Sequence, residues 1–228
     1  MPRAGARHRT AALVSVIAAW SAGCASWVPF VGSGHAARDQ EIYGSTGDQR
    51  IATLVAEAKA ARAAGPAGQE EFSRRLVSEM LGEHDPQVRR RILKVAADFD
   101  APAAVAICKG ALQDPDPEVR MEACSVWADR GGPEAVSLLA ARATTDTELD
   151  VRLRALRMLG ELGDERAVPV LAKALEDPDP AVQYRAVAAL KRVSGRDLGD
   201  DVNKWREWAA DPEGGPAWSV AEGLRRIF

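Results

Sequence analysis

The chain has 228 residues, of which 46% are hydrophobic and 5% aromatic, and its formal net charge is −3. This length and apolar content are sufficient to bury a hydrophobic core without metals or crosslinks. Ala, Leu, Val and Arg dominate the composition, which favours helices over a β-sandwich or a β-barrel. The small net charge and the lack of a long basic tail argue against nucleic acid as a partner.

Residues 1–23 have the layout of a secretory signal peptide. Three arginines within the first ten residues precede the apolar run 11–20, which is shorter than the roughly 20 residues of a membrane-spanning helix. Small residues then lead into Cys24, although Ser21 stands where Leu is usual. The segment resembles the bacterial lipobox, and the resemblance implies cleavage before Cys24 and its lipidation with acyl chains. An ordinary cleaved signal with an incidental cysteine is the alternative.

Removal of the signal leaves 27 basic against 33 acidic side chains, a net charge of −6. Residues 24–48 contain scattered glycines and serines without a sustained hydrophobic period, which predicts a flexible tether. The folded domain is expected to occupy residues 49–228. Together these features predict a lipoprotein of the bacterial cell envelope, on the periplasmic side and attached to the membrane through its lipid anchor.

A valine recurs along the folded part at an almost constant interval. Four valines mark the repeat, at steps of 31, 32 and 31 residues: Val88, Val119, Val151 and Val182. Apolar or small residues at helical spacing follow each valine, and a break rich in Gly, Asp or Pro separates them from a second apolar segment. Two helices therefore fill one period, and neighbouring pairs must stack because neither helix can bury its apolar face alone.

An Asp-Pro dipeptide precedes three of these valines, at 85–86, 116–117 and 179–180. An Asp at the N-cap accepts hydrogen bonds from free backbone N–H groups, and a Pro at the first helical position needs no donor. Each dipeptide is therefore predicted to start a helix. The third unit has Glu148 at the cap position, so we expect Asp146 or Thr147 to cap a helix that begins earlier.

The unit 146–175 combines Val-Arg, an Ala and Leu face, a Gly-Asp turn and Ala-Val-Pro-x-Leu. This pattern resembles the short HEAT-like repeats, including their lyase-type subgroup, and the resemblance extends over residues 85–194. It implies an all-α fold, an α-α superhelix or HEAT-like solenoid, in which the second helices line the concave surface. It implies no substrate, because such repeats serve scaffolds, adaptors and enzymes alike.

The repeats and the two atypical ends can be delimited from the sequence. We expect a divergent first pair at 49–82, repeats at 85–113, 114–145, 146–176 and 177–200, and a C-terminal cap at 201–228. The first pair is predicted to contain helices at 51–64 and 69–81. Three tryptophans of the last segment, Trp205, Trp208 and Trp218, are interpreted as covering the open apolar end rather than binding a ligand.

Arginines follow three of the repeated valines, and a glutamine follows the fourth: Arg89, Arg120, Arg152 and Gln183. With acidic residues at the helix starts, the arginines are expected to form a ladder of exposed ion pairs, each contributing about 0–1 kcal/mol. Arg89 begins the densest basic cluster, residues 89–91, which could bind a phosphate or an anionic lipid headgroup. A solvated helix face is the favoured interpretation of that cluster.

Two cysteines, Cys108 and Cys124, align with apolar core positions of the other units and are expected to pack as small hydrophobic residues. An exported protein could also join them in a disulfide, and the sequence leaves this alternative open. The three histidines are far apart in the sequence, so no metal site is predicted.

The sequence carries no nucleophile elbow, no phosphate-binding Gly-rich loop and no histidine paired with a nucleophile, so we predict neither an enzyme nor a cofactor. Four mildly polar positions of the second helices are candidate partner-binding residues: Lys109, Gln113, Lys173 and Glu176. The hypothesis is an exported, membrane-tethered, monomeric scaffold that binds a protein or peptide and no nucleic acid. The alternative, implied by the resemblance alone, is a bilin-lyase-like or other enzyme-associated assembly factor.

Overall fold

The computed structural model describes residues 44–212 of the chain. Within this range the fold consists of helices and their connections, without a strand. The predicted signal peptide, Cys24, most of the tether and Trp218 lie outside the described residues. Among the helices described, none is long and apolar enough to cross a membrane.

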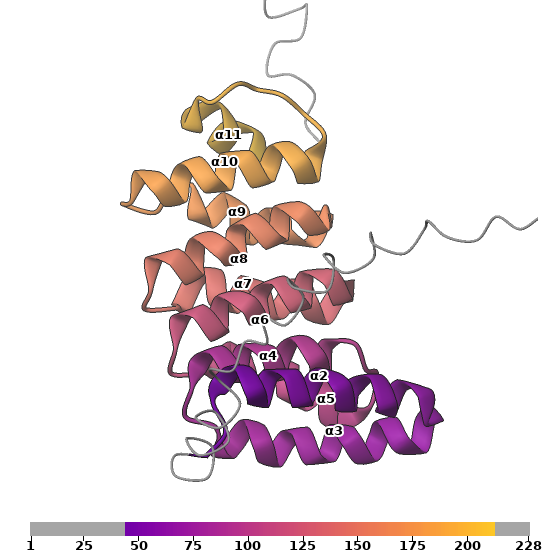
Figure 1. Ribbon diagram of the computed structural model, residues 1–228. Helices are drawn as coiled ribbons and strands as arrows, with labels where there is room; N and C mark the ends of the chain where they lie inside the picture. Colours follow the sequence, from indigo (N-terminus) through magenta and orange to yellow (C-terminus); the bar gives the residue numbers. More distant parts are fainter. Residues whose placement is uncertain (1–43, 213–228) are drawn as a thin grey trace, which may run out of the picture. The chain divides into compact units, whose positions relative to one another are not determined.

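One row of helices runs through the described part of the fold, each helix packing against the next (Figure 1). These are the first helices of successive pairs: α2 (Gly47–Ala63), α4 (Pro86–Ala97), α6 (Pro117–Arg130), α8 (Leu149–Leu162) and α10 (Pro180–Ser194). Each buries a stripe of apolar side chains on the neighbouring pairs, as predicted for a repeat that cannot fold alone. The all-α solenoid expected from the sequence is confirmed.

The second helices pack on the first helices and on one another. They are α3 (Gly65–Gly82), α5 (Pro102–Gly110) with the 3-10 turn η1 (Ala111–Gln113), α7 (Gly132–Thr145), the 3-10 turn η2 (Glu165–Ala167) with α9 (Val168–Ala174), and α11 (Val202–Ala210). Because α11 packs on both α9 and α10, it takes the place of the second helix in the last pair.

The first pair departs from the boundaries predicted for its helices. The helix predicted to begin at residue 51 begins at Gly47, and the one predicted at residue 69 begins at Gly65. Only Ala64 separates the two helices, because Gly65 adopts a positive φ of 75° that other residues rarely accept. A proline next to this glycine then favours immediate entry into α3.

The predicted helix starts at Asp-Pro dipeptides are confirmed. The side chains of Asp85, Asp116 and Asp179 accept the backbone N–H two residues further on, at 2.9, 2.9 and 2.8 Å. Asp201 caps α11 in the same way, at 2.9 Å. Short-range chemistry therefore fixes where most first helices begin.

The third repeat was predicted to start its helix early, and this prediction is wrong. The helix α8 begins at Leu149, after Glu148, whose side chain makes no capping bond. Asp146 instead accepts the N–H of Glu148 at 3.1 Å and binds the side chain of Arg120. Asp146 thus corresponds to Asp114 and Asp177, which stand two positions before the caps Asp116 and Asp179.

The step from Val119 to Val151 has 32 residues, one more than the other two steps. The extra residue lies in α7, the second helix that precedes the loop of Asp146. Thirteen positions separate Pro133 from Asp146, against twelve between Pro102 and Asp114. The longer helix α7 absorbs the insertion, so the loop that carries the aspartate keeps its spacing to the next first helix.

Cys108 and Cys124 are fully buried free thiols, so the disulfide left open by the sequence is not formed. Burial raises the pKa of the Cys124 thiol to about 12, which keeps it protonated at neutral pH. The indole of Trp127 donates to the backbone carbonyl of Cys108 at 3.0 Å. Both cysteines therefore serve the core as small apolar residues, as predicted.

The C-terminal tryptophans within the described range cover the end of the core. Trp205 is fully buried, and its indole N–H donates to the carbonyl of Gly199 at 2.8 Å. Trp208 is half-buried, with its ring edge-to-face on that of Trp205 at 5.6 Å between centroids. This placement agrees with a capping role.

Candidate partner-binding groove

The arginine after the first repeated valine joins two neighbouring loops. The guanidinium of Arg89 binds both carboxylate oxygens of Asp114, with its Nε at 2.9 Å and its Nη2 at 2.7 Å. Its Nη1 donates to the backbone carbonyls of His84 and Glu83, at 3.0 and 3.3 Å. Such a two-fold contact fixes both distance and orientation.

The same contact recurs one repeat later and is buried. Arg120 binds Asp146 through two hydrogen bonds of 3.0 and 2.9 Å and donates to the carbonyl of Asp114 at 2.8 Å. Only 10% of the Arg120 side chain and 2% of the Asp146 side chain are exposed. The prediction that these ion pairs are exposed is therefore wrong for Arg120. The predicted partners were acidic residues at the helix starts, but Arg120 pairs with Asp146 in the loop before the next helix pair.

The ladder changes character toward the C-terminus. Arg152 donates to the carbonyls of Asp146 and Thr147, at 3.1 and 3.3 Å. Gln183, which was expected to interrupt the series, donates to the carbonyl of Asp177 at 2.7 Å. The bond to the preceding loop therefore continues through all four repeats, while the ion pair occurs in the first two.

The proposed basic cluster at residues 89–91 is divided between different contacts. Arg89 points into the loop, where Asp114 holds it. Arg90 lies near Glu122 at 3.3 Å, and the ammonium of Lys94 lies 3.2 Å from the same carboxylate. The favoured interpretation of the cluster as a solvated helix face is therefore wrong for Arg89, whose side chain is 11% exposed.

The pKa of Asp146 reflects its buried ion pair with Arg120. Burial opposes its charged form, but the hydrogen bonds from Arg120 and from the Glu148 N–H outweigh this and hold its pKa below 3.8. The hydrogen bond to Asp146 also raises the pKa of Arg120. Because the folded-state pKa of Asp146 is depressed, its contribution to stability is present above the unfolded-state pKa and is lost as the pH falls.

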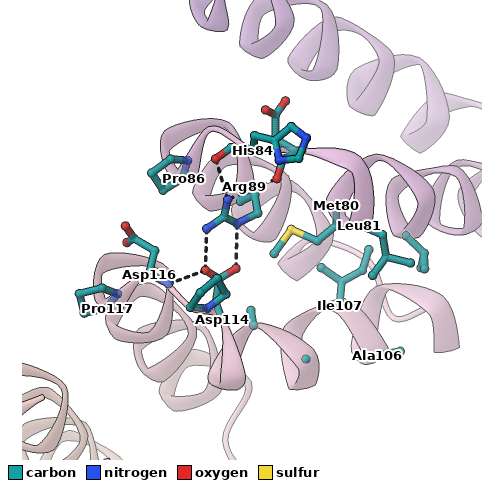
Figure 2. A pocket seen from close by; sticks show the side chains of 15 residues that line it. Met80, Leu81, His84, Pro86, Arg89, Ala106, Ile107, Asp114, Asp116 and Pro117 are labelled. Atoms are coloured by element: carbon teal, nitrogen blue, oxygen red, sulfur yellow. Dashed lines mark hydrogen bonds and ion pairs between the residues drawn. The ribbon is translucent and has the colours of Figure 1, made fainter. Parts of the chain in front are cut away.

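A cavity of about 790 Å³ opens between α3 and α5, beside the Arg89–Asp114 pair (Figure 2). We call it the α3–α5 groove. Its lining residues are Val77, Met80, Leu81, Glu83, His84, Pro86, Arg89, Ala106, Ile107, Gly110, Ala111, Asp114, Pro115, Asp116 and Pro117. The groove is thus formed by the ends of two second helices and the starts of the two first helices that follow.

The floor of the groove is apolar and buried, whereas its edge is apolar and exposed. Ile107 and Ala111 are 5% and 2% exposed, and Leu81 is 83% exposed. Leu81 lies in the last turn of α3, whereas Ile107 and Ala111 lie in α5 and in the turn η1 that continues it.

The other end of the groove is polar. Asp114 is held by Arg89, and Glu83 accepts hydrogen bonds from Arg50 at 3.2 Å and from the Asp85 N–H at 2.8 Å. Asp116 caps α6 through the backbone N–H groups of the two residues after Pro117. This end therefore combines two ion pairs with a helix cap.

A smaller hollow of about 220 Å³ lies between α7 and α9. It has the equivalent place two repeats later, since its lining includes residues from the ends of both second helices and from the loop before α10. Thr144, Lys173 and Glu176 are among its polar lining residues.

The four candidate residues named from the sequence do not gather at one site. Lys109 is exposed and pairs with Glu134 at 3.0 Å, and Gln113 is exposed in η1. Lys173 and Glu176 line the smaller hollow, where Glu176 also pairs with Arg206 of α11 at 2.8 Å.

Sequence reasoning missed the larger groove because its apolar residues look like core residues. Val77, Met80 and Leu81 have the i, i+3, i+4 spacing of a buried helix face, but Leu81 is exposed. Within the described residues, no group of three or more His, Cys, Asp and Glu side chains could hold a metal ion.

Comparison with known proteins identifies the repeats. The family model for HEAT repeats matches residues 73–152 and 142–222. The chain belongs to the HEAT repeat family. This HEAT repeat protein also matches the crystal structure of an engineered protein from the Northeast Structural Genomics Consortium, with 20% identity and a TM-score of 0.42. That match covers 74% of this chain and 91% of the engineered one. No curated protein matches the chain.

Loss of the buried arginine tests the ladder. We predict that Arg120→Ala lowers the free energy of unfolding by about 3–5 kcal/mol, because Asp146 is left buried without its main cation. Urea unfolding at pH 7 measures this, with Arg157→Ala of the exposed Arg157–Glu161 pair as a control that should change by about 1 kcal/mol or less.

Acidification provides a second measurement on the same pair. The wild-type protein should lose stability as the pH falls below 3.8 toward the lower folded-state pKa of Asp146, and Arg120→Ala should show less of this loss because the hydrogen bond that lowers this pKa is removed. If Arg120→Ala and Arg157→Ala lower the free energy of unfolding by the same amount at pH 7, the Arg120–Asp146 pair contributes no more to stability than an exposed ion pair.

Proposed function

We propose that this HEAT repeat protein is a non-catalytic scaffold that holds a protein or peptide partner in the α3–α5 groove. The observation that carries the proposal is an exposed Leu81 beside the buried apolar floor formed by Ile107 and Ala111. A concave apolar surface with a few polar groups at one end is typical of a binding site. The ion pairs of the lining are already satisfied and serve to shape the groove.

We further propose that the scaffold is exported and tethered to the bacterial envelope through a lipid on Cys24. The support is the arrangement of residues 1–24, where arginines, an apolar run and small residues precede the cysteine. The net charge of −6 after removal of the signal gives no attraction to nucleic acid. Nothing in the groove favours the enzyme-associated alternative, which rests on the family resemblance alone.

Photo-crosslinking in intact cells tests the groove. A photoreactive phenylalanine analogue at position 81 should give one dominant crosslinked product, because this side chain lies at the groove edge. The same analogue at Tyr184, a 63% exposed side chain on α10, is the matched control and should give no such product. If both positions yield the same pattern of products, the groove is not the binding surface.

The membrane anchor is tested separately. Mass spectrometry of the membrane fraction should find a mature chain that begins at an acylated Cys24, and Cys24→Ser should move the protein to the soluble fraction. A mature chain with any other N-terminus, or a Cys24→Ser variant that stays with the membrane, would contradict lipid anchoring.

A further inference from the structure

The α3–α5 groove has two chemically different ends (Figure 2). Met80, Leu81 and Ile107 lie toward one end, and Asp114 and Asp116 lie at the other. A segment that occupies the whole groove would therefore meet an apolar surface along one part of its length and carboxylates along the rest. The volume of about 790 Å³ suits several side chains of a peptide rather than a whole domain.

The cation at the polar end is largely occupied, because four of its five N–H groups donate hydrogen bonds within the protein. Arg89 is the guanidinium of the lining, and its Nε and Nη2 bind the two oxygens of Asp114. Its Nη1 binds two backbone carbonyls. A carboxylate or phosphate on a partner could make a two-fold contact through Nε and Nη2 only by displacing Asp114 from this ion pair.

The carboxylates, in contrast, leave negative charge at the groove. Asp114 has its cation in Arg89, and Glu83 has its cation in Arg50. The hydrogen bonds of Asp116 come from the backbone N–H groups of Glu118 and Val119, which are neutral donors. Asp116 forms no side-chain ion pair with another described residue, although it interacts electrostatically with Arg89. The lining holds three carboxylates, Glu83, Asp114 and Asp116, against one guanidinium, and this excess of negative charge attracts positive charge on an occupant.

From this arrangement we propose that the groove selects a peptide segment with an apolar face and an adjacent Lys or Arg. The apolar side chains lie against Met80, Leu81 and Ile107, and the basic side chain approaches Asp116. The proposal deepens the proposed function and rests on it, because it names the chemical class of the partner segment.

The test uses two synthetic helical peptides of about 14 residues, or four turns, as probes for the purified full-length protein. Both carry Leu at i, i+3, i+4 and i+7 in an Ala background, and they differ only in having Lys or Glu beside the Leu face. Fluorescence anisotropy should show that the Lys peptide binds about tenfold more tightly than the Glu peptide at low salt, and that salt reduces this preference.

Two pairs of variants assign the preference to the groove. Asp116→Asn keeps a good N-cap while removing the charge, so it should abolish most of the Lys preference; Asp179→Asn makes the same change at α10 and should not. Leu81→Ser should weaken both peptides about fivefold or more through loss of apolar contact. Tyr184→Ser alters an exposed side chain outside the groove and should leave both affinities unchanged.

The possible failures have different meanings. If both peptides bind with equal affinity and Leu81→Ser weakens both, the groove binds peptides but the basic preference is wrong. If neither peptide binds although position 81 still crosslinks to a partner, the proposed class of partner is wrong and the scaffold function stands. If sedimentation shows a dimer that Leu81→Ser dissociates, a second copy occupies the groove and the peptide proposal is overturned.

Discussion

The fold depends on the burial of each helix pair against the next. Leu156 of α8 and Leu190 of α10 are completely buried, and they belong to helices whose apolar faces would be exposed to water without a neighbour. Gly160 shows how close this packing is, since a Cβ added there would lie 2.8 Å from the Cα of Ala189. Each repeat therefore supplies part of its neighbour's core.

Apolar burial does not by itself fix how one repeat is oriented on the next, whereas the hydrogen bonds of the arginine ladder do. A two-fold contact such as Arg120–Asp146 holds one loop at a set distance from the next. The first member of the ladder, Arg89–Asp114, also forms a wall of the α3–α5 groove. The contact that sets the spacing of two repeats thus shapes the polar end of the groove and occupies the arginine that could otherwise have bound an acidic partner.

The features that follow from local chemistry could be predicted from the sequence. Asp116 before a proline is sufficient to place a helix start, and Cys124 was assigned to the core from its position in the repeat. Contacts between repeats were harder to predict, because the partner of Arg120 lies 26 residues away in a loop whose role becomes clear only when pairs are stacked. The exposed position of Leu81 depends on which neighbours pack against the end of α3, and the spacing of apolar residues within one helix does not reveal this.

A central consequence of the packing is that the α3–α5 groove exists before any partner binds. Hydrogen–deuterium exchange on the free protein tests this most directly, through the amides of residues 104–111, which include the groove floor. These amides should be protected to a degree similar to those of α6 and α8, because Ile107 and Ala111 are buried in the same continuous core. Exchange of 104–111 as fast as that of an unstructured peptide would show that the groove forms only on binding and would contradict this account.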